Sequence, residues 1–393
     1  MGGDAGAGAG LDAGHPPARD RFTRWPRWRA RLGLLALALM ILASALVPIG
    51  AGVQQVKTAP AVENPAAGRT GTAGRPDDED LALYDRVIAR IRKGEAYYDV
   101  IVAEHRRGHY PVRPGFAVRL PTLAYIAAWL GVPGQIAAAI LLVLAVLAAW
   151  WRRLGDESPP QQRRLALAFL FAGVSLGLNR HYFALHELWS GMLLALAFGL
   201  HRPGRWGWSL AAAALALAIR EHALPFVLLM GAMAFRRQDW REGAAWSALA
   251  AGFLALLSIH LHIVAMQVLP GDLSSPPWLA LRGLSGWLSN IVLSSSLRFL
   301  PHWLAGPAVM LMITGWANWR SPAGAFGTLL FLGYGLLFMV AGRPDNFYWG
   351  VEIAPVMFIG LAFSGQAVRS LVAAASFGSP ARTGPRKIVA PEP

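Results

Sequence analysis

Residues 32–53 decide the fold class of this chain, and their sequence is LGLLALALMILASALVPIGAGV. The stretch contains no charged residue, and about 20 consecutive apolar residues are enough for a helix to cross the hydrocarbon layer of a bilayer. The preceding residues, from Arg19 to Arg31, are rich in arginine and resemble the basic region of a signal peptide. Because the apolar run is long and more such runs follow it, we interpret it as an uncleaved anchor whose amino-terminal side stays in the cytoplasm.

The composition of the whole chain agrees with a protein dissolved in lipid. Of the 393 residues, 55% are hydrophobic and 15% are charged, whereas about a quarter of a typical soluble domain is charged. The net charge of +14 comes from arginines in short clusters between apolar runs, which membrane orientation explains better than nucleic-acid binding. The chain has no cysteine, which excludes disulfides and thiolate metal sites.

More apolar runs follow the first, and together they predict an all-α, polytopic membrane helical bundle of about ten transmembrane helices. The later runs lie at 133–151, 165–179, 184–200, 206–219, 223–235, 244–269, 303–318, 323–341 and 351–368. Arginines recur on alternate connections, at 152–164, 202–205, 236–241 and 320. The positive-inside rule therefore predicts that both termini are cytoplasmic. The excess of arginine over lysine and the abundance of alanine are typical of a bacterial genome, so we expect the bacterial inner (plasma) membrane.

The predicted organisation is a single transmembrane domain with short tails. The parts are a basic, partly disordered cytoplasmic tail at 1–31, the membrane domain at 32–372 with an external loop at 54–118, and a disordered cytoplasmic tail at 373–393. Two segments fit this scheme poorly as spans. Residues 116–130 are too short and carry an arginine and a proline, and residues 283–300 are amphipathic. We expect both to form helices that lie on, or partly enter, the outer surface.

Charged and polar side chains gather on the connections predicted to be external. Charged groups are costly in a membrane protein, so their positions carry information. The alternative is that each of them only caps a helix end or reaches the lipid headgroups. External arginines oppose the positive-inside bias, however, and several stand beside a carboxylate or histidine in short turns. The predicted external cluster contains Arg180, His181, Glu187, Arg220, Glu221, Arg343, Asp345, Asn346 and Tyr348.

The external loop contains a predicted helix that begins near Pro76 and ends near Gly94. At about 100° per residue its apolar side chains share one face. That face consists of Leu83, Tyr84, Val87, Ile88 and Ile91. Asp80 falls in the middle of this face, whereas Glu79 flanks it. A carboxylate held against protein or bilayer suits a general base, although a first-turn acid can also serve only the helix dipole.

Aromatic residues, prolines and arginines alternate after this helix. Tyr97 and Tyr98 come first, and Arg113 and Arg119 follow beside prolines. Near a bilayer surface these residue types suit a lipid-linked phosphate and a sugar ring, because guanidinium groups bind phosphate through paired hydrogen bonds. Interfacial anchoring is the alternative, chiefly for the two tyrosines.

These residues resemble the GT-C class of membrane glycosyltransferases, which includes protein mannosyltransferases and aminoarabinose transferases of lipid A. The matching features are Asp80 for the acidic motif, Tyr84 four residues on, Gly94 at the helix end, the tyrosine pair, and the arginine- and proline-rich stretch 113–121. The resemblance implies an inverting transfer of a sugar from a polyprenyl-phosphate carrier, with the aspartate as base and arginines on the lipid phosphate.

The leading hypothesis is therefore a glycosyltransferase that uses a polyprenyl-phosphate-linked sugar and a periplasmic glycan, lipid or protein as acceptor, surrounded by membrane lipids and without metal, cofactor or nucleic acid. The catalytic candidates are Asp80 and Glu79. The substrate-binding candidates are Tyr84, Tyr97, Tyr98, Arg113, Arg119, Arg180, His181, Glu187, Arg220, Glu221, Arg343, Asp345, Asn346 and Tyr348. The alternatives are a transporter or flippase of a lipid-linked or polysaccharide precursor, whose path these groups would line, and a scaffold without catalysis.

Overall fold

The computed structural model describes residues 20–50 and 76–376, with the side chains of residues 76–80 left out. Within these ranges the chain is helical, and its extended segments form only isolated bridges and no β-strand. The predicted all-α class is therefore confirmed for this part of the chain. The predicted disorder at the start of the chain, before residue 20, and after residue 376 falls on residues outside these ranges.

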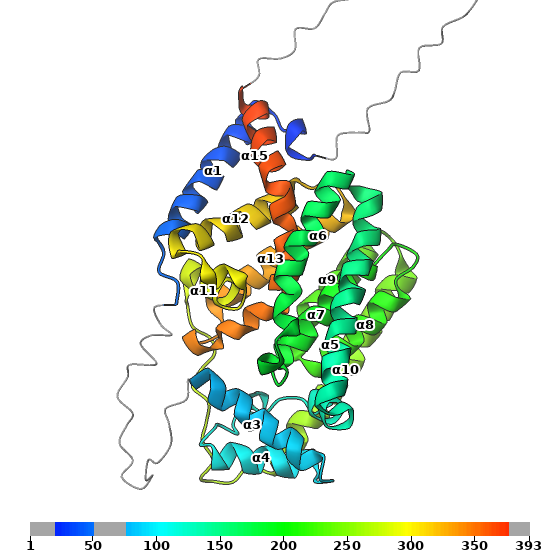
Figure 1. Ribbon diagram of the computed structural model, residues 1–393, viewed down its shortest axis with the longest axis vertical. Helices are drawn as coiled ribbons and strands as arrows, with labels where there is room; N and C mark the ends of the chain where they lie inside the picture. Colours follow the sequence, from blue (N-terminus) through cyan, green and yellow to red (C-terminus); the bar gives the residue numbers. More distant parts are fainter. Residues whose placement is uncertain (1–19, 51–75, 377–393) are drawn as a thin grey trace, which may run out of the picture.

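The α-helices fall into a large bundle and a small separate layer (Figure 1). The α-helices are α1 (Arg27–Leu46), α3 (Pro76–Ile91), α4 (Tyr97–Arg107), α5 (Thr122–Glu157), α6 (Pro160–Val174), α7 (His186–Leu200), α8 (Gly207–Ile219), α9 (Leu224–Arg236), α10 (Trp240–Met266), α11 (Gly283–Leu293), α12 (His302–Asn318), α13 (Pro322–Val340), α14 (Ala354–Met357) and α15 (Leu361–Ser376). The short 3₁₀ helices are η1 (Phe22–Arg24), η2 (Gly115–Ala117), η3 (Ser175–Leu178), η4 (Arg180–Tyr182), η5 (Glu221–Ala223), η6 (Ser296–Phe299), η7 (Pro344–Glu352) and η8 (Phe358–Gly360).

Local sequence signals fix several helix ends. The Asp239 side chain accepts a hydrogen bond of 3.0 Å from the Glu242 N–H at the start of α10, and the Ser321 hydroxyl accepts one of 2.9 Å from the Gly324 N–H at the start of α13. Both are N-caps, which satisfy amides that have no partner inside the helix. The helix α3 stops before Gly94, whose φ of +91° favours glycine. Its predicted bounds are thus confirmed.

The α3–α4 layer lies at one end of the bundle, and the two described chain ends lie together at the other (Figure 1). The chain ends are joined to each other: Asp20 accepts a hydrogen bond from the Ser370 hydroxyl, and Arg31 donates one to the carbonyl of Ala375. The arginine-bearing connections lie at this same end. Arg153 at the end of α5, for example, donates hydrogen bonds to the carbonyls of Phe198 and His201.

Every predicted apolar run overlaps a helical segment of the described chain. Five segments are long and apolar enough to cross a membrane, judged by length and composition. These are Arg27–Leu46, Gly115–Glu157, Trp240–Met266, Pro322–Val340 and Ala354–Ser376. Helices α7 and α8 are apolar but shorter.

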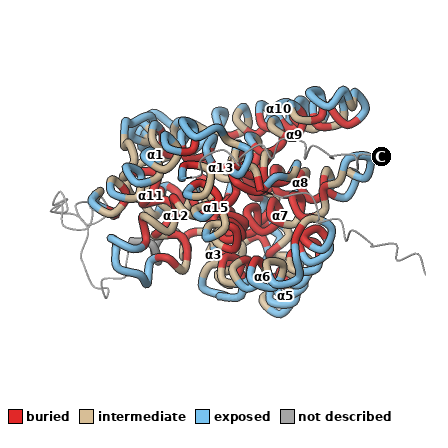
Figure 2. Tube along the Cα trace, turned by 90° about the horizontal axis from the view of Figure 1, so that it is seen from above, coloured by how far each residue is buried: buried red, intermediate tan, exposed pale blue. Residues whose placement is uncertain are grey.

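The buried residues lie inside the bundle and the exposed residues on its outside (Figure 2), and many of the exposed residues are large and apolar. On α1 the side chains of Leu35, Leu39 and Leu42 are each more than half exposed, and on α10 Leu256 and Ile259 are as well. A soluble protein rarely exposes so many large apolar groups together. The surface therefore favours a helical membrane protein.

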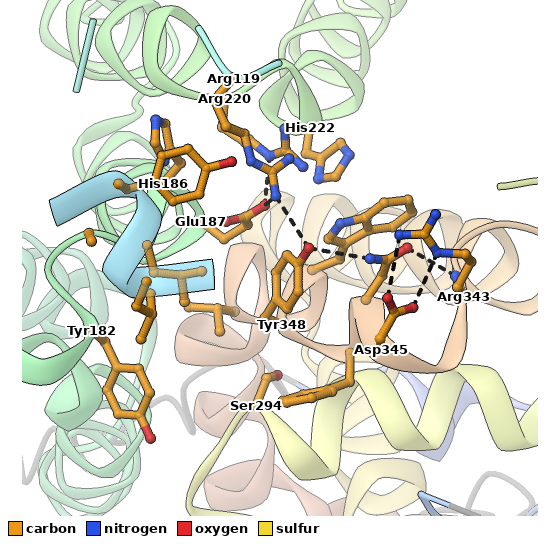
Figure 3. Close-up of a pocket in the computed structure, with 18 of the residues that line it drawn as sticks. Arg119, Tyr182, His186, Glu187, Arg220, His222, Ser294, Arg343, Asp345 and Tyr348 are labelled. Atoms are coloured by element: carbon orange, nitrogen blue, oxygen red, sulfur yellow. Dashed lines mark hydrogen bonds and ion pairs between the residues drawn. The ribbon is translucent and has the colours of Figure 1, made fainter. Parts of the chain in front are cut away.

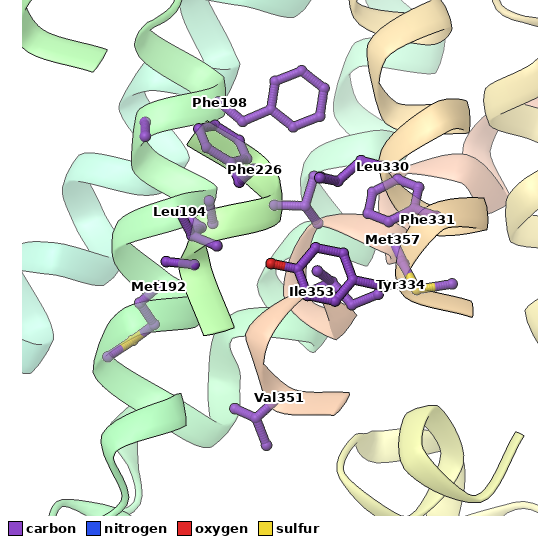
Figure 4. Packing of buried hydrophobic residues seen from close by; sticks show 14 of the residues in the cluster. Met192, Leu194, Phe198, Phe226, Leu330, Phe331, Tyr334, Val351, Ile353 and Met357 are labelled. Atoms are coloured by element: carbon purple, nitrogen blue, oxygen red, sulfur yellow. The ribbon is translucent and has the colours of Figure 1, made fainter. Parts of the chain in front are cut away.

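Aromatic rings and glycines hold the bundle together. Phe198 of α7 and Trp316 of α12 stack with their ring centroids 5.7 Å apart, and Phe226, Phe331 and Tyr334 surround the same core (Figure 4). The helix α12 touches the chain near η8 through Gly315, where an added Cβ would lie 1.9 Å from a backbone oxygen. Small residues allow such close approach of helices, as is common where helices pack in membranes.

Three predicted features need correction. Residues 283–300 are not a surface helix, because most of α11 is buried against α12, α13 and η7, with Trp287 packed on Gly335 of α13. Residues 116–130 are not a separate surface helix either, because from Thr122 onward they are the first part of α5, which continues past a kink at Gly131 with a φ of +63°. The predicted disordered tail starting at residue 373 is also wrong at its beginning, since α15 continues to Ser376.

Candidate functional site

A cavity of about 570 Å³ lies between the α3–α4 layer and the adjoining end of the bundle (Figure 3). Its walls come from α3, α4 and η2, from the connection before α7 and the first turn of α7, from the connection after α8, and from η6 and η7. The structure brings ten of the predicted site residues to these walls. They are Tyr84, Arg119, His181, Glu187, Arg220, Glu221, Arg343, Asp345, Asn346 and Tyr348.

Glu187 lies at the centre of the cavity floor, in the first turn of α7. Its carboxylate is buried between two guanidinium groups, with Arg220 Nε 2.7 Å and Arg119 Nη2 3.4 Å from Oε1. The side chains of these arginines are 2% and 12% exposed. Neither carboxylate oxygen has a partner with hydrogen-bond geometry in the described part of the chain. Both oxygens are fully buried, so the carboxylate itself is closed to a ligand, and its charge balances those of the two guanidinium groups beside the cavity.

The backbone explains why Arg220 points inward. Arg220 follows the last turn of α8 in an extended conformation, with φ −146° and ψ +122°, and η5 begins at the next residue. This sharp change of direction turns the side chain of Arg220 back toward Glu187. Its Nη1 also donates a hydrogen bond to the Glu221 carboxylate, which is 19% exposed on the cavity wall.

Arg119 links the floor to the wall formed by η7. Its Nη2 donates a hydrogen bond of 3.3 Å to the Tyr348 hydroxyl, and its guanidinium carbon lies 5.9 Å from the centre of the tyrosine ring. The same hydroxyl accepts a 3.2 Å bond from Asn346 Nδ2 (Figure 3). The Asn346 amide oxygen in turn accepts a 3.1 Å bond from the backbone N–H of Arg343. A chain of hydrogen bonds therefore fixes three side chains of this wall.

Arg343 lies at the other end of this series of hydrogen bonds, and its side chain is more exposed than that of Arg119. Its guanidinium group pairs with Asp345 at 3.2 Å and donates a 2.9 Å hydrogen bond to the Ser275 hydroxyl. The side chain is 26% exposed. A ligand phosphate could therefore approach Arg343 without displacing a buried partner.

His222 contributes a neutral ring to the cavity wall. Its imidazole packs edge to face on Trp349, with ring centroids 4.5 Å apart. Burial holds the pKa of His222 well below its ordinary value, and the positive charges of Arg220 and Arg119 lower that pKa further. The ring is therefore uncharged at neutral pH.

Arg298 lies on the cavity rim, in η6. Its Nη1 donates a 3.3 Å hydrogen bond to the Tyr182 hydroxyl, and its side chain is exposed. It has no ion pair with a carboxylate in the described residues. Of the described side chains that line the cavity, four are arginines and three are carboxylates. This surplus of one positive charge favours an anionic ligand.

The predicted apolar face of α3 is confirmed. Leu83 and Val87 are buried with Ile91, and Tyr84 packs its ring against His186 with centroids 5.1 Å apart. Tyr84 also lines the cavity. Glu79 and Asp80 belong to the backbone of the same helix, but their side chains lie outside the described residues, so their proposed catalytic role stays a prediction.

Four other predicted site residues lie away from the cavity walls. Tyr97 is buried and its hydroxyl donates a 2.6 Å hydrogen bond to the carbonyl of Arg119, so it supports the cavity from behind. Tyr98 pairs with His260 of α10 at 3.1 Å. Arg113 donates a hydrogen bond to the carbonyl of Asp272, and Arg180 is exposed on η4. Their contacts are structural in the described chain.

Other cavity residues were not predicted from the sequence as site residues. They include His105, Tyr182, Ser275, Trp278 and Ser294. The signal in Pro276-Pro277-Trp278 was an aromatic residue beside prolines, the same kind of signal that indicated residues 113–121. His105 carried no signal, because it lies in an amphipathic helix and only the fold shows which way it points.

Among the described residues, no group of three or more histidine, aspartate or glutamate side chains is placed to hold a metal ion. Comparison with known proteins finds no family model, no curated protein and no solved structure that matches this chain. The argument about function therefore rests on the geometry and chemistry of the cavity.

Proposed function

We propose that this protein is an inverting glycosyltransferase that moves a sugar from a polyprenyl-phosphate carrier to a periplasmic glycan, lipid or protein. The observation that carries the proposal is the cavity floor, where Arg119 and Arg220 flank buried Glu187 beside apolar helices. A donor of this class needs an anion site, a surface for a sugar ring and access from lipid. The cavity offers the first two, and the exposed apolar helices supply the lipid contact.

The proposal includes ten crossings of a bacterial inner membrane, with both termini in the cytoplasm. Two facts support this topology. The arginine-bearing connections and the described chain ends share one end of the bundle (Figure 1), and the residues that line the cavity lie at the other end, beside α3 and α4. Cytoplasmic loops carry the excess of arginine, so the cavity would face the periplasm.

Arginines of the cavity are the candidates for binding the carrier phosphate. Guanidinium groups donate paired, charge-assisted hydrogen bonds to phosphate oxygens. Arg298 has no carboxylate partner in the described chain, and Arg343 has an open one, so both can receive the phosphate at low cost. Arg119 and Arg220 already face Glu187 and would set the positive potential of the floor. The aromatic side chains of Tyr348 and Trp349 suit the faces of a sugar ring.

The chemical step needs a base and a leaving group. The base, for which Asp80 is our candidate, takes the proton of the acceptor hydroxyl, and the hydroxyl oxygen attacks the anomeric carbon from the face opposite the phosphate. The bond from the anomeric carbon to the phosphate oxygen breaks, and its electron pair leaves with polyprenyl phosphate. The new glycosidic bond therefore has inverted configuration. Asp80 lies four residues before Tyr84, a spacing that places both on one face of α3.

Reconstituted protein provides the test. We would supply liposomes with synthetic short-chain polyprenyl-phosphate hexoses and pentoses and with envelope extracts as acceptors, and follow release of polyprenyl phosphate by mass spectrometry. The proposal predicts release that requires acceptor, with the product sugar inverted. In cells that lack the gene, one polyprenyl-phosphate sugar should accumulate and one envelope sugar should be missing. Movement of intact donor between leaflets without release of carrier would instead establish a transporter or flippase. Absence of both activities would favour the scaffold without catalysis.

A further inference from the structure

Glu221 and His222 form a polar corner of the cavity that is open to a ligand. Both residues line the cavity, and their side chains are 19% and 20% exposed. They belong to η5, the short 3₁₀ turn between α8 and α9. Figure 3 shows the His222 ring next to Arg220, among the side chains of the cavity wall. The Glu187 carboxylate is fully buried, whereas this corner can touch a bound molecule.

The Glu221 carboxylate has one oxygen in use and one that is available. Oε1 accepts a hydrogen bond from Arg220 Nη1 and lies 3.9 Å from Nε2 of His222. Oε2 has no hydrogen bond within the described chain, although the side chain is partly exposed on the cavity wall. A carboxylate oxygen can only accept hydrogen bonds. The partner that Oε2 can bind is therefore a donor, such as a hydroxyl group.

The His222 ring offers a second place for a hydroxyl group. The distance of 3.9 Å to Glu221 is too long for a hydrogen bond, and the described residues give neither ring nitrogen another such bond. The ring is neutral, because burial and two neighbouring arginines lower its pKa. One nitrogen of a neutral imidazole therefore carries a proton and the other a lone pair. A hydroxyl group can bind either nitrogen, since it both donates and accepts.

The fold holds both side chains of the corner in place. The carbonyl of His222 accepts a hydrogen bond from the Tyr334 hydroxyl, and the ring packs edge to face on Trp349 with centroids 4.5 Å apart. The Glu221 carboxylate is held by Arg220, whose side chain is 2% exposed. Groups that are fixed before binding lose little conformational freedom when a ligand arrives. The corner is thus preorganised for polar contacts.

The charges around the corner balance, and this balance decides which ligand group fits. Positive and negative side chains alternate in a row, and the row contains Arg119, Glu187, Arg220 and Glu221. Its two positive and two negative charges cancel, and the neutral ring of His222 adds none. A phosphate or a sugar carboxylate would meet the Glu221 charge at short range, whereas an ammonium group would meet Arg220. A neutral hydroxyl group meets neither penalty.

We infer that Glu221 and His222 bind hydroxyl groups of the transferred sugar and select a neutral sugar against one that carries a carboxylate. The inference deepens the proposed function and rests on it for the class of ligand, a lipid-linked sugar. Arg298 and Arg343 remain the candidates for the carrier phosphate. Glu221 and His222 act as specificity residues, and Asp80 remains the candidate base.

A gain of binding gives the sharpest test. The probes are pairs of non-hydrolysable short-chain polyprenyl phosphonates, one with a neutral hexose and one with the hexuronic acid of the same configuration. By titration calorimetry, wild type should bind the best hexose at least about tenfold more tightly than its hexuronic acid. Glu221→Gln keeps an oxygen for Arg220 but removes the negative charge. This variant should bind the hexuronic acid about tenfold more tightly than wild type does, a gain that damage to the fold cannot produce.

His222→Phe tests the second residue of the corner. Phenylalanine can keep the packing on Trp349 but has no nitrogen, so affinity for the hexose probe should fall about tenfold without a lower unfolding temperature. His186 is the matched control, because it lines the same cavity and packs edge to face on Tyr84 with centroids 5.1 Å apart. Its Nε2 is buried, however. His186→Phe should therefore leave the preference between the two probes unchanged.

The outcomes separate the inference from the proposed function. Equal binding of both probes by wild type, or the same preference in wild type and Glu221→Gln, would overturn the inference even if transfer were established. Tighter binding of an amino-hexose probe than of the hexose would also overturn it, because the corner would then bind an ammonium group. Absence of carrier release from every phosphate donor, with the preference for hexose intact and dependent on Glu221, would instead overturn the transferase and leave the sugar site.

Discussion

The helix α7 carries a buried ionic cluster at each end, and the two clusters differ in how well their carboxylates are satisfied. Just beyond its last residue, His201 Nε2 lies 2.7 Å from Glu242, which also accepts hydrogen bonds of 2.9 Å from Arg237 and 3.2 Å from Trp246. At the first turn, Glu187 is close to two arginines but has no partner with hydrogen-bond geometry in the described chain. The helix rises about 20 Å between the clusters.

The difference indicates separate roles for the two ends. The Glu242 cluster joins α7, α9 and α10, has full hydrogen bonding and does not line the cavity described above, so we interpret it as a structural cluster that holds these helices together. The Glu187 cluster leaves polar atoms unpaired beside a cavity, which is the arrangement expected of a binding site. Burial of charge alone therefore does not identify a functional site in this fold. Incomplete hydrogen bonding next to a cavity is the feature that distinguishes the Glu187 cluster from the Glu242 cluster.

The same substitution at both clusters tests this contrast and should give the largest effect. Glu242→Gln places an amide NH₂ where an oxygen now accepts hydrogen bonds, so at least one buried donor loses its partner. We expect a loss of about 3 kcal/mol, seen as a lower unfolding temperature of purified protein by intrinsic tryptophan fluorescence. Glu187→Gln should cost clearly less, because that carboxylate has no complete hydrogen bond to lose. The contrast fails if Glu187→Gln is the less stable of the two.

Asp80→Asn should have the next largest effect, on activity. The substitution keeps the size of the side chain and removes the base, so turnover should fall by about 10²-fold while binding of the donor stays nearly unchanged. The measurement is single-turnover release of polyprenyl phosphate. Glu79→Gln is the neighbouring control and should cost much less. If Glu79→Gln were the inactive variant, the base would be the neighbouring residue and the helical-face argument would be wrong.

The third largest effect should come from substitution of the cavity arginines. A charge-assisted contact to phosphate is typically worth about 1.5–3 kcal/mol, so Arg343→Ala should weaken binding of the donor by roughly 10- to 100-fold. Arg119→Ala should also weaken binding, but with some loss of stability, because it leaves Glu187 with fewer counter-charges. Titration calorimetry with a non-hydrolysable donor phosphonate measures the first effect, and unfolding temperature measures the second. Unchanged affinity in both variants would remove these two arginines from the phosphate site.

The sequence was informative wherever one chemical preference dominated. Apolar runs and arginine-bearing connections predicted the helices and gathered Arg220 and Arg343 at one end, because the penalty for placing charge in lipid is large. The interior position of α11 was missed, because a segment with Trp287 and Asn290 has the same pattern whether it meets a headgroup or a packed interior. His105 was missed for a related reason. It lies in an amphipathic helix, and only the fold brings that helix to the cavity wall.

The smallest effect should come from an ion pair that is half open to water, and it completes the comparison with the two buried clusters. Arg106 of α4 binds both oxygens of Asp272, at 2.7 Å and 2.8 Å, while its own side chain is 36% exposed. These hydrogen bonds, together with one from the Leu269 N–H, lower the pKa of Asp272 to about 2. Because the pKa in the folded state lies below the ordinary value of 3.8, the contribution to stability is present above about pH 4 and is lost as the pH falls toward 2.

We expect Asp272→Asn to cost less than about 1 kcal/mol at pH 7, since water screens such pairs. The gap in unfolding temperature between wild type and variant should stay constant from pH 7 to 5 and narrow below pH 4. A difference in unfolding temperature that widens at low pH, or one as large as that of Glu242→Gln, would show that the Arg106–Asp272 pair behaves like the buried Glu242 cluster.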